Sequence, residues 1–347
     1  MLKVALLPGD GIGTEVIAAA LHVLEVAAKK YDFALQTKWF DLGAERYLRT
    51  GETLPDADFA GLRDDFDAIL LGAFGDPRVP SNIHAKEILL GLRQRLDLYV
   101  NLRPVKLFDA RLCPLKDVGP AAIDMAIVRE NTESVYVGIG GSFKFGTPDE
   151  VAQNTMLSTR KGADRLLKFA FELAQTRRGK LVLCDKANAI ESAHGIWRRA
   201  LRDLIPQYPD VVATTLYADV AAMRMVTHPH EFDVVVGDNM IGDILSDLAA
   251  ALVGGLGLAP SSSTHPGRVA MYEPVHGSAP DIVGTGKANP LAAILSTAML
   301  LRDFGQVAAA DALDAASARS VQDRKTTPDL GGTLTTDQVS ALIAEQI

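Results

Sequence analysis

Short apolar runs that end at polar or glycine-containing turns recur along the chain, and amphipathic stretches follow them. Such runs cover residues 4–7, 68–71, 125–128, 181–184 and 232–236. Between them lie segments with apolar residues at helical spacing, for example 165–174. Regular alternation of strand and helix predicts an α/β protein with mostly parallel sheets. The 347 residues are enough for two domains of ordinary size.

The composition argues against several classes of protein. The 35 basic and 43 acidic side chains give a net charge of −8, which disfavours nucleic acid but permits a small anionic substrate held by a few arginines. Cys113 and Cys184 are too few for a disulfide framework or a cysteine-ligated zinc site. No apolar window reaches the roughly 18 to 20 residues of a membrane span, and the first residues do not resemble a signal peptide. We therefore expect a cytoplasmic protein without a membrane partner.

One glycine-rich segment, residues 138–148, interrupts the alternation of strands and helices. Its brief polar and apolar alternation indicates either an exposed surface loop or a hairpin arm that clasps a second subunit. The first glycine-rich turn, from Gly9 to Gly13, is similar to a dinucleotide fingerprint, but Thr14 occupies the position of the third glycine. The sequence therefore argues against an ordinary Rossmann site.

Two aspartates, Asp243 and Asp247, lie four residues apart after an apolar run. We predict a loop over 237–242 and a helix that begins near Asp243, so that both carboxylates share one helical face. Two like charges this close favour a bound cation, and carboxylate oxygens suit Mg²⁺ or Mn²⁺. Alternatively, Asp243 only stabilises the helix start and Asp247 is solvated.

Basic residues also accompany the predicted strands and helices. Arg93 lies on a predicted helix, Arg103 in an Asn-Leu-Arg-Pro segment, and Arg129 at the end of an apolar run. Guanidinium groups bind carboxylates through paired hydrogen bonds, so three converging arginines would suit a dicarboxylate. Separately, each would be a surface or ion-pair residue. Lys186 directly follows a predicted strand and is either a base with a lowered pKa or a solvated lysine.

Taken together, these segments resemble the metal-dependent β-decarboxylating dehydrogenases of 2-hydroxy acids. That superfamily includes the 3-isopropylmalate, isocitrate, homoisocitrate, tartrate and D-malate dehydrogenases. The resemblance extends over nearly the whole chain and is greatest to the isopropylmalate branch. The motifs that carry it are LLPGDGIGTEV, LRQRLDLYVNLRPVK, VRENTESVY, DKANAI, YADVAAM, FDVVVGDNMIGDILSDLAAAL, EPVHGSAPDIVGTGKANP and TPDLGGT.

The resemblance implies an isopropylmalate dehydrogenase-like two-domain α/β fold with mostly parallel sheets. It implies a cofactor-binding domain of residues 1–98 plus 251–347. Residues 99–250 would form a substrate-binding and dimerisation domain, with an arm at about 138–160. The protein would be a homodimer whose subunits share each active site.

The resemblance also implies a non-Rossmann NAD site. Asp281 would accept hydrogen bonds from both ribose hydroxyls, and its charge would repel a 2′-phosphate, which favours NAD over NADP. Glycines such as Gly277 would let the backbone approach the ligand. The residues implied at the cofactor are Ile12, Asn188, His276, Gly277, Ser278, Ala279, Pro280, Asp281, Ile282 and Asn289.

For the chemistry, the resemblance implies a divalent cation, Mg²⁺ or Mn²⁺, held by Asp243, Asp247 and Asp219 of the partner subunit. Lys186, also from the partner and assisted by Asp219, would remove the hydroxyl proton while hydride passes to NAD⁺. Loss of a carboxylate from C3 would follow, and Tyr136 would protonate that carbon. The same resemblance assigns the substrate carboxylates to Arg93, Arg103 and Arg129.

The helix before Arg93 indicates the substrate. Leu89 and Leu90 would bury an isopropyl group, whereas isocitrate enzymes usually place Ser or Asn there. We therefore expect NAD-dependent oxidative decarboxylation of (2R,3S)-3-isopropylmalate to 4-methyl-2-oxopentanoate, a reaction of leucine biosynthesis. The sequence differs from many isopropylmalate enzymes at two places. Lys86 stands where those enzymes have Glu, and the segment 129–134 is more similar to isocitrate and tartrate enzymes, with Ser134 in place of a Gly.

Tartrate or D-malate dehydrogenase is the first alternative, followed by isocitrate or homoisocitrate dehydrogenase. A non-catalytic regulatory subunit is the alternative of a different class. Such a subunit would be expected to lack a metal-binding aspartate, Lys186 or Tyr136, and this chain retains all of them.

Overall fold

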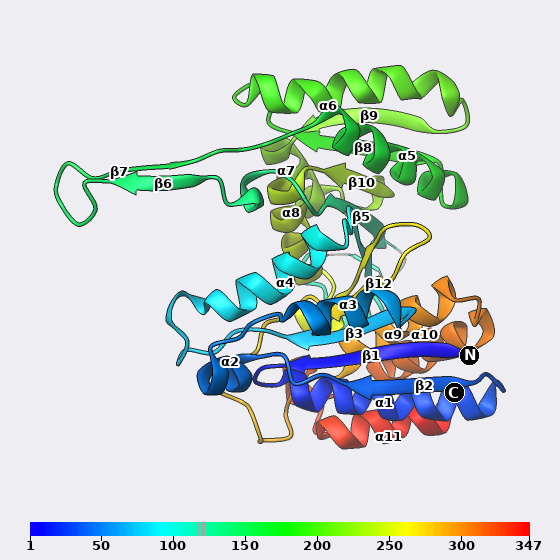
Figure 1. Cartoon of the computed structure of the whole chain (residues 1–347). Coiled ribbons are helices and arrows are strands. Elements are labelled where there is room, and N and C mark those ends of the chain that lie inside the picture. The colour runs from blue at the N-terminus through cyan, green and yellow to red at the C-terminus, as the bar shows by residue number, and fades with distance from the viewer. Residues whose placement is uncertain (117, 120–121) are drawn as a thin grey trace. The chain divides into compact units, whose positions relative to one another are not determined.

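The computed structural model describes residues 1–116, 118–119 and 122–347. The chain forms two compact units, drawn together in Figure 1. Unit 1 comprises Met1–Leu98, Lys106–Ala121 and Ala250–Ile347, and unit 2 comprises Tyr99–Val105 and Ala122–Ala249.

Lys106–Ala121 belongs to unit 1, whereas the resemblance implies that residues 99–250 all lie in the second domain. Local contacts explain the difference. The Arg111 side chain donates to the Val321 carbonyl, and the Gln322 side chain donates to the Phe108 carbonyl. Leu112 packs against the apolar core of unit 1. These contacts hold the segment on unit 1.

The sheet of unit 1 is parallel except for one antiparallel pair. Its strands lie in the order β2 (Leu35–Trp39), β1 (Leu2–Gly9), β3 (Ala68–Ala73), β12 (Ala270–Pro274) and β11 (Pro260–Thr264). Alternate side chains of a strand point to opposite faces, so Val4 and Leu6 enter one core while Ala5 and Leu7 enter the other.

Helices cover both faces of this sheet. The first core includes residues of α1 (Gly13–Lys30), α9 (Leu291–Asp303), α10 (Val307–Gln322) and α11 (Thr336–Gln346). The second includes residues of α3 (Asp56–Asp64) and α4 (Ile83–Arg95), and α2 (Ala44–Thr50) contacts α4. Unit 1 is therefore a three-layer α/β/α unit, as predicted for buried parallel strands.

The strands of unit 2 lie in the order β4 (Val100–Lys106), β5 (Asp124–Glu130), β10 (Val234–Gly237), β8 (Lys180–Asp185) and β9 (Val212–Tyr217). β10 is parallel to β5 and β8, and β8 is parallel to β9. Its core packs α5 (Arg160–Thr176) and α6 (Glu191–Leu204) on these strands. The remaining helices are α7 (Ala218–Thr227) and α8 (Asn239–Ala251). Short 3₁₀ turns occupy Pro80–Asn82, Ala110–Leu112, Val135–Val137, Ile205–Gln207, Pro229–Glu231, Leu256–Leu258 and Pro328–Leu330.

The glycine-rich segment forms an exposed hairpin, as predicted, and the contact of this hairpin with a second subunit stays a prediction. β6 (Gly140–Phe143) pairs antiparallel with β7 (Val151–Asn154), and Figure 1 shows the hairpin extending away from the helices of unit 2. Its apolar side chains are exposed, with Phe143 at 68% and Phe145 at 82%.

The start of α8 differs from the prediction. The helix begins at Asn239, four residues before Asp243, and the predicted loop over 237–242 is mostly helical. The cause is the Asp238 carboxylate, which accepts a hydrogen bond from the Ile241 N–H at 2.9 Å and thereby satisfies a free donor of the first turn.

None of the helices in the described part of the chain combines the length and the apolar character that a transmembrane span requires.

Candidate active site

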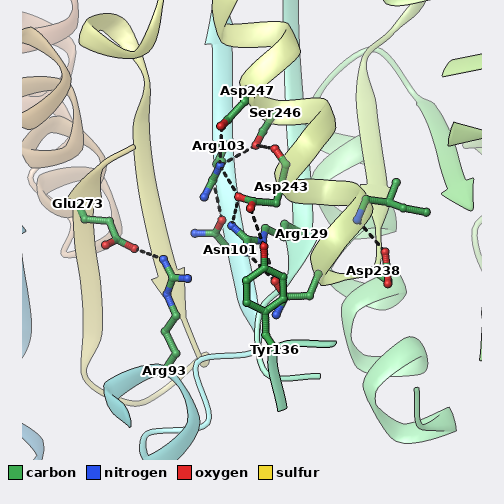
Figure 2. A network of polar contacts seen from close by, with 12 residues as sticks. Arg93, Asn101, Arg103, Arg129, Tyr136, Asp238, Asp243, Ser246, Asp247 and Glu273 are labelled. Atoms are coloured by element: carbon green, nitrogen blue, oxygen red, sulfur yellow. Dashed lines mark hydrogen bonds and ion pairs between the residues drawn. The ribbon is translucent and has the colours of Figure 1, made fainter. Parts of the chain in front are cut away.

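Asp243 and Asp247 lie on α8 within reach of the same buried arginine, as Figure 2 shows. Arg103 Nη1 on β4 is 3.3 Å from a carboxylate oxygen of each aspartate. The same nitrogen donates to the Ser246 hydroxyl at 2.7 Å, and Arg103 Nε donates to the Asn101 side chain at 2.9 Å. The predicted sharing of one helix face by the two aspartates is thus observed, together with a cation beside them.

A second arginine, Arg129 near the end of β5, pairs with the same carboxylate oxygen of Asp243, Oδ1, that Arg103 approaches. Arg129 also donates twice to the Asn239 side chain, at 2.9 and 2.7 Å. A Cβ on Gly242 would lie within 2.7 Å of the Arg129 side chain, so a residue without a side chain is required where α8 passes the arginine. Tyr136 completes this group, since its hydroxyl donates to Asp243 Oδ2 at 2.8 Å. We call Arg103, Arg129, Tyr136, Asp243 and Asp247 the aspartate–arginine cluster.

Within this cluster the two arginines face the two aspartates, and the pKa of Asp247 is shifted. Burial raises the pKa of Asp247, Arg103 lowers it, and the nearby charge of Asp243 raises it, so that the pKa lies above its ordinary value. Carboxylate oxygens under mutual repulsion fit Mg²⁺ or Mn²⁺ chemically. Among the described residues of one chain, however, no three acidic, histidine or cysteine side chains are arranged to hold a metal ion. Asp243 and Asp247 by themselves therefore do not make a complete metal site in the described part of one chain.

Lys186 and Asp219 form a separate pair in unit 2. Lys186 follows β8 and Asp219 lies in the first turn of α7, with Lys186 Nζ 2.8 Å from Asp219 Oδ1. The hydrogen bond from Lys186 holds the pKa of Asp219 below its ordinary value. The structure thus brings the predicted base and its predicted assistant together, although Asp219 does not complete a three-carboxylate group with Asp243 and Asp247 in the described part of a single chain.

In unit 1, Arg93 near the end of α4 is paired with a carboxylate that the sequence analysis did not single out. Arg93 Nη2 lies 2.6 Å from Glu273 Oε1 on β12, and both side chains are buried (Figure 2). The sequence does contain a sign of Glu273, because this residue is charged and lies within an otherwise apolar strand. Leu89 and Leu90 lie on the same helix and are partly buried. Leu89 packs against the core of unit 1.

The predicted cofactor loop, residues 276–289, is held mainly through its backbone. The Ile12 N–H donates to the Ser278 carbonyl at 2.9 Å. A Cβ on Gly11, which has φ +56°, would lie 2.0 Å from the same carbonyl oxygen, so only glycine fits there. The Gly284 N–H donates to the Glu15 side chain at 2.7 Å. The loop is therefore fixed against the first turn of α1.

Some side chains of this loop bond within the protein, whereas others face solvent. The Asn289 side chain bonds within the protein: it donates to Asp329 at 2.9 Å and accepts from the Leu291 N–H at 3.0 Å. Burial lowers the pKa of His276, so its ring is neutral near pH 7. Asp281 is exposed, and a Cβ on Gly277 would meet no described atom within 4 Å.

The exposed Asp281 carboxylate and the open space beside Gly277 are compatible with a nucleotide that lies against the loop. The other residues implied at the cofactor are buried Ser278, partly buried Ala279 and Ile282, exposed Pro280 and, in unit 2, exposed Asn188.

Residues 3–344 match the family described as isocitrate/isopropylmalate dehydrogenase. The chain belongs to this family. Its relatives include proteins named 3-isopropylmalate dehydrogenase from Corynebacterium kroppenstedtii, 47% identical over 100% of this chain and 99% of that protein, and from Thermobifida fusca, 46% identical over 100% and 98%. An isocitrate dehydrogenase structure from Methylococcus capsulatus has a TM-score of 0.90 at 34% identity, covering 100% of this chain and 99% of its own. Membership confirms the predicted family, the α/β fold and the enzyme class, a dehydrogenase.

Other polar residues of the site were missed by the sequence analysis. Asn101, Asn239 and Ser246 hold the arginines in place, and their signal was only their closeness in sequence to the predicted residues. Asp238 and His194 are buried next to the loop that carries Lys186. A buried charged or imidazole side chain often indicates a special structural or functional role. Its burial, however, becomes known only once the fold is known.

Proposed function

We propose that the chain catalyses the NAD-dependent, divalent-metal-dependent oxidative decarboxylation of (2R,3S)-3-isopropylmalate to 4-methyl-2-oxopentanoate. The observation that carries the proposal is the aspartate–arginine cluster, in which two arginines and two carboxylates from different elements meet at one face of α8. Such a group has the charges needed for a dicarboxylate bound together with a metal ion. The full-length relatives that bear the name of this enzyme support the same assignment.

The metal ligands would be Asp243 and Asp247 of one subunit with Asp219 of the partner subunit. When bound, a divalent cation supplies Lewis-acid chemistry toward the substrate hydroxyl and the neighbouring carboxylate. Arg103 and Arg129 would exchange part of their pairing with the aspartates for the carboxylates of the substrate, and Arg93 would contribute a third guanidinium. Because all three arginines are buried, their charges are weakly screened and bind carboxylates strongly.

Two residues of the chain would move protons. Lys186, held by Asp219, would accept the proton of the C2 hydroxyl, and NAD⁺, when bound, would supply the hydride acceptor for C2. The carboxylate on C3 would leave as CO₂. The Tyr136 hydroxyl, which is oriented by Asp243, would then donate a proton to C3. Each of these proton transfers is worth about 10²- to 10⁴-fold in rate.

The cofactor would bind against the loop 276–289. Asp281 would accept the ribose hydroxyls and disfavour the extra phosphate of NADP. The open space next to Gly277 would let the backbone approach the adenosine half. The nicotinamide end would contact Asn188.

A dimer follows from the same proposal, because Lys186 and Asp219 would serve the site of the other subunit. The hairpin β6–β7 supplies exposed aromatic side chains, Phe143 and Phe145, that a partner would cover. Sedimentation velocity should therefore show a dimer at assay concentrations, and a fully active monomer would contradict the shared site.

A substrate ranking tests the proposed function. We expect the purified chain with NAD⁺ and Mn²⁺ to form NADH fastest from 3-isopropylmalate when kcat/KM is compared with D-malate, tartrate and isocitrate in one assay. Leu89 and Leu90 on α4, both partly buried, would offer apolar contact to the isopropyl group, and each methylene that becomes buried is worth about 0.8 kcal/mol. Tartrate, D-malate or isocitrate in first place would overturn the substrate assignment. Absence of turnover with all four would favour a regulatory subunit.

A further inference from the structure

The imidazole of His194 is buried in the first turn of α6, where it contacts the backbone that carries Lys186. His194 is 1% exposed, and its Nδ1 accepts a hydrogen bond from the Lys186 N–H at 2.8 Å. An imidazole nitrogen that accepts carries no proton, so the proton of the neutral ring resides on Nε2. The ring therefore has one fixed orientation with respect to Lys186.

The opposite edge of the ring faces a buried carboxylate. His194 Nε2 lies 3.5 Å from Asp238 Oδ2, so the buried Nε2–H faces the carboxylate across a gap longer than an ordinary hydrogen bond. The same oxygen accepts the Ser134 hydroxyl at 2.7 Å, and Asp238 Oδ1 caps α8 through the Ile241 N–H. Burial alone would raise the pKa of Asp238, but its contacts with His194, the Ile241 N–H and Ser134 bring it below its ordinary value. The carboxylate is thus ionised and held from several sides.

Ser134 occupies a backbone conformation that serine rarely adopts. Its φ is +68° and its ψ is −146°, a region that favours glycine. The residue is 1% exposed and forms an isolated bridge with Leu157. A glycine would relieve the strain but would lack the hydroxyl that binds Asp238. The strained serine therefore provides a specific donor to the carboxylate behind His194.

We propose that His194 is a positioning residue for Lys186, and that Asp238 and Ser134 fix its ring. We call His194, Asp238 and Ser134 the lysine anchor. A second contact, from the Ala187 N–H to Asp185 at 2.9 Å, restrains the other side of the same turn. With both contacts in place, the Lys186 side chain starts from a fixed backbone and reaches Asp219. The inference rests on the proposed role of Lys186 as the base.

The two nitrogens of the ring suggest a pair of variants that separates their roles. In His194→Asn, the amide oxygen occupies the place of Nδ1 and accepts the Lys186 N–H. In His194→Gln, the longer side chain reaches toward Asp238 but leaves no acceptor at the Nδ1 position. Leu201→Ala, a buried position on the same helix, is the control for a purely structural loss. Neither His194 variant changes a group expected to touch substrate or cofactor.

We expect His194→Gln to lower kcat by roughly 10- to 100-fold, because displacement of a catalytic group by about 1 Å costs on that order. His194→Asn should keep kcat within about threefold of the wild type, and both variants should leave the KM values for NAD⁺ and 3-isopropylmalate within about twofold. Leu201→Ala should lower the unfolding temperature with little change in kcat. Ser134→Gly should lower kcat less than His194→Gln while keeping or raising the unfolding temperature.

The inference is overturned if His194→Gln matches His194→Asn in kcat, or if kcat follows the unfolding temperature across all variants, including Leu201→Ala. Lys186→Ala, measured in parallel, distinguishes this failure from failure of the proposed function. If Lys186→Ala is inactive while both His194 variants have the same kcat, only the anchor is wrong. If Lys186→Ala remains fully active, the proposed role of Lys186 is wrong, and the proposed role of the lysine anchor is then wrong as well.

Discussion

The aspartate–arginine cluster of unit 2 and the loop 276–289 of unit 1 are both pre-formed, but by different forces. The cluster is held by contacts between charged side chains from β4, β5 and α8, such as Arg103 with Asp247. The loop is held by its backbone, through the Ile12 N–H and the close approach of Gly11. Charged side chains bind and polarise a ligand, whereas backbone positions set how closely it approaches. The two regions should therefore respond to different substitutions.

The largest effect is expected from Asp243, which contacts Arg103, Arg129 and Tyr136. We expect Asp243→Asn to lower kcat by about 10³-fold, since it weakens a proposed metal ligand and releases the proposed acid, whose step alone is worth about 10²- to 10⁴-fold. The concentration of Mn²⁺ for half-maximal rate should also rise. Ser246→Ala, which removes only one partner of Arg103, is the matched control and should cost less than about tenfold.

The next effect isolates proton donation within the cluster. Tyr136→Phe removes the hydroxyl that bonds to Asp243 but retains the ring beside Arg129. We expect kcat to fall by about 10²-fold with an unchanged KM for NAD⁺. Steady-state kinetics check this, and a wild-type kcat would remove Tyr136 from the mechanism.

Two glycine substitutions test the loop. Gly11→Ala should lower the free energy of unfolding by about 1 to 3 kcal/mol or more, because it combines a positive φ with a clash at the Ser278 carbonyl. Gly277→Ala meets no described atom within 4 Å, so stability should not change. Its KM for NAD⁺ should nevertheless rise, because the methyl group would stand where the cofactor approaches. Thermal melts and NAD⁺ titrations measure the two effects, and a Gly277→Ala enzyme with normal NAD⁺ binding would remove this loop from the cofactor site.

The smallest effect is the pH dependence that Asp238 contributes. Its pKa in the folded protein lies below the value of about 3.9 for an unfolded chain, so it stabilises the fold above that value and loses this contribution as the pH falls through the folded pKa. As the pH falls from 5 to 3, the wild type should therefore lose more free energy of unfolding than Asp238→Asn, by at most about 1.4 kcal/mol for each unit of the pKa difference. Urea titrations across this range measure it. Parallel losses in the two proteins would contradict the assignment.

Much of the fold could be predicted from periodicity, because apolar runs and amphipathic stretches report directly on strands and helices. The start of α8 could not, since it depends on the Asp238 side chain, which has no periodic signal. Residues 106–121 were misplaced for a similar reason, because side-chain to carbonyl contacts such as Arg111 with Val321 hold them on unit 1.

Within the candidate site, residue type was enough to single out Asp243, Asp247 and the arginines. The pairing of Arg93 with Glu273 required the fold, because 180 residues separate the two. The lysine anchor could not be predicted from the sequence either, since His194, Asp238 and Ser134 lie far apart in the chain and their burial is known only from the fold.

The central claim is that this chain needs a divalent cation at carboxylates from α8 to oxidise its hydroxy acid. The most direct test removes metal from the purified protein with a chelator and follows NADH formation from 3-isopropylmalate and NAD⁺. We predict that the rate falls to background and returns when Mn²⁺ is added, but not in the Asp243→Asn protein at the same Mn²⁺ concentration. An undiminished rate in the chelator-treated wild type would contradict the account.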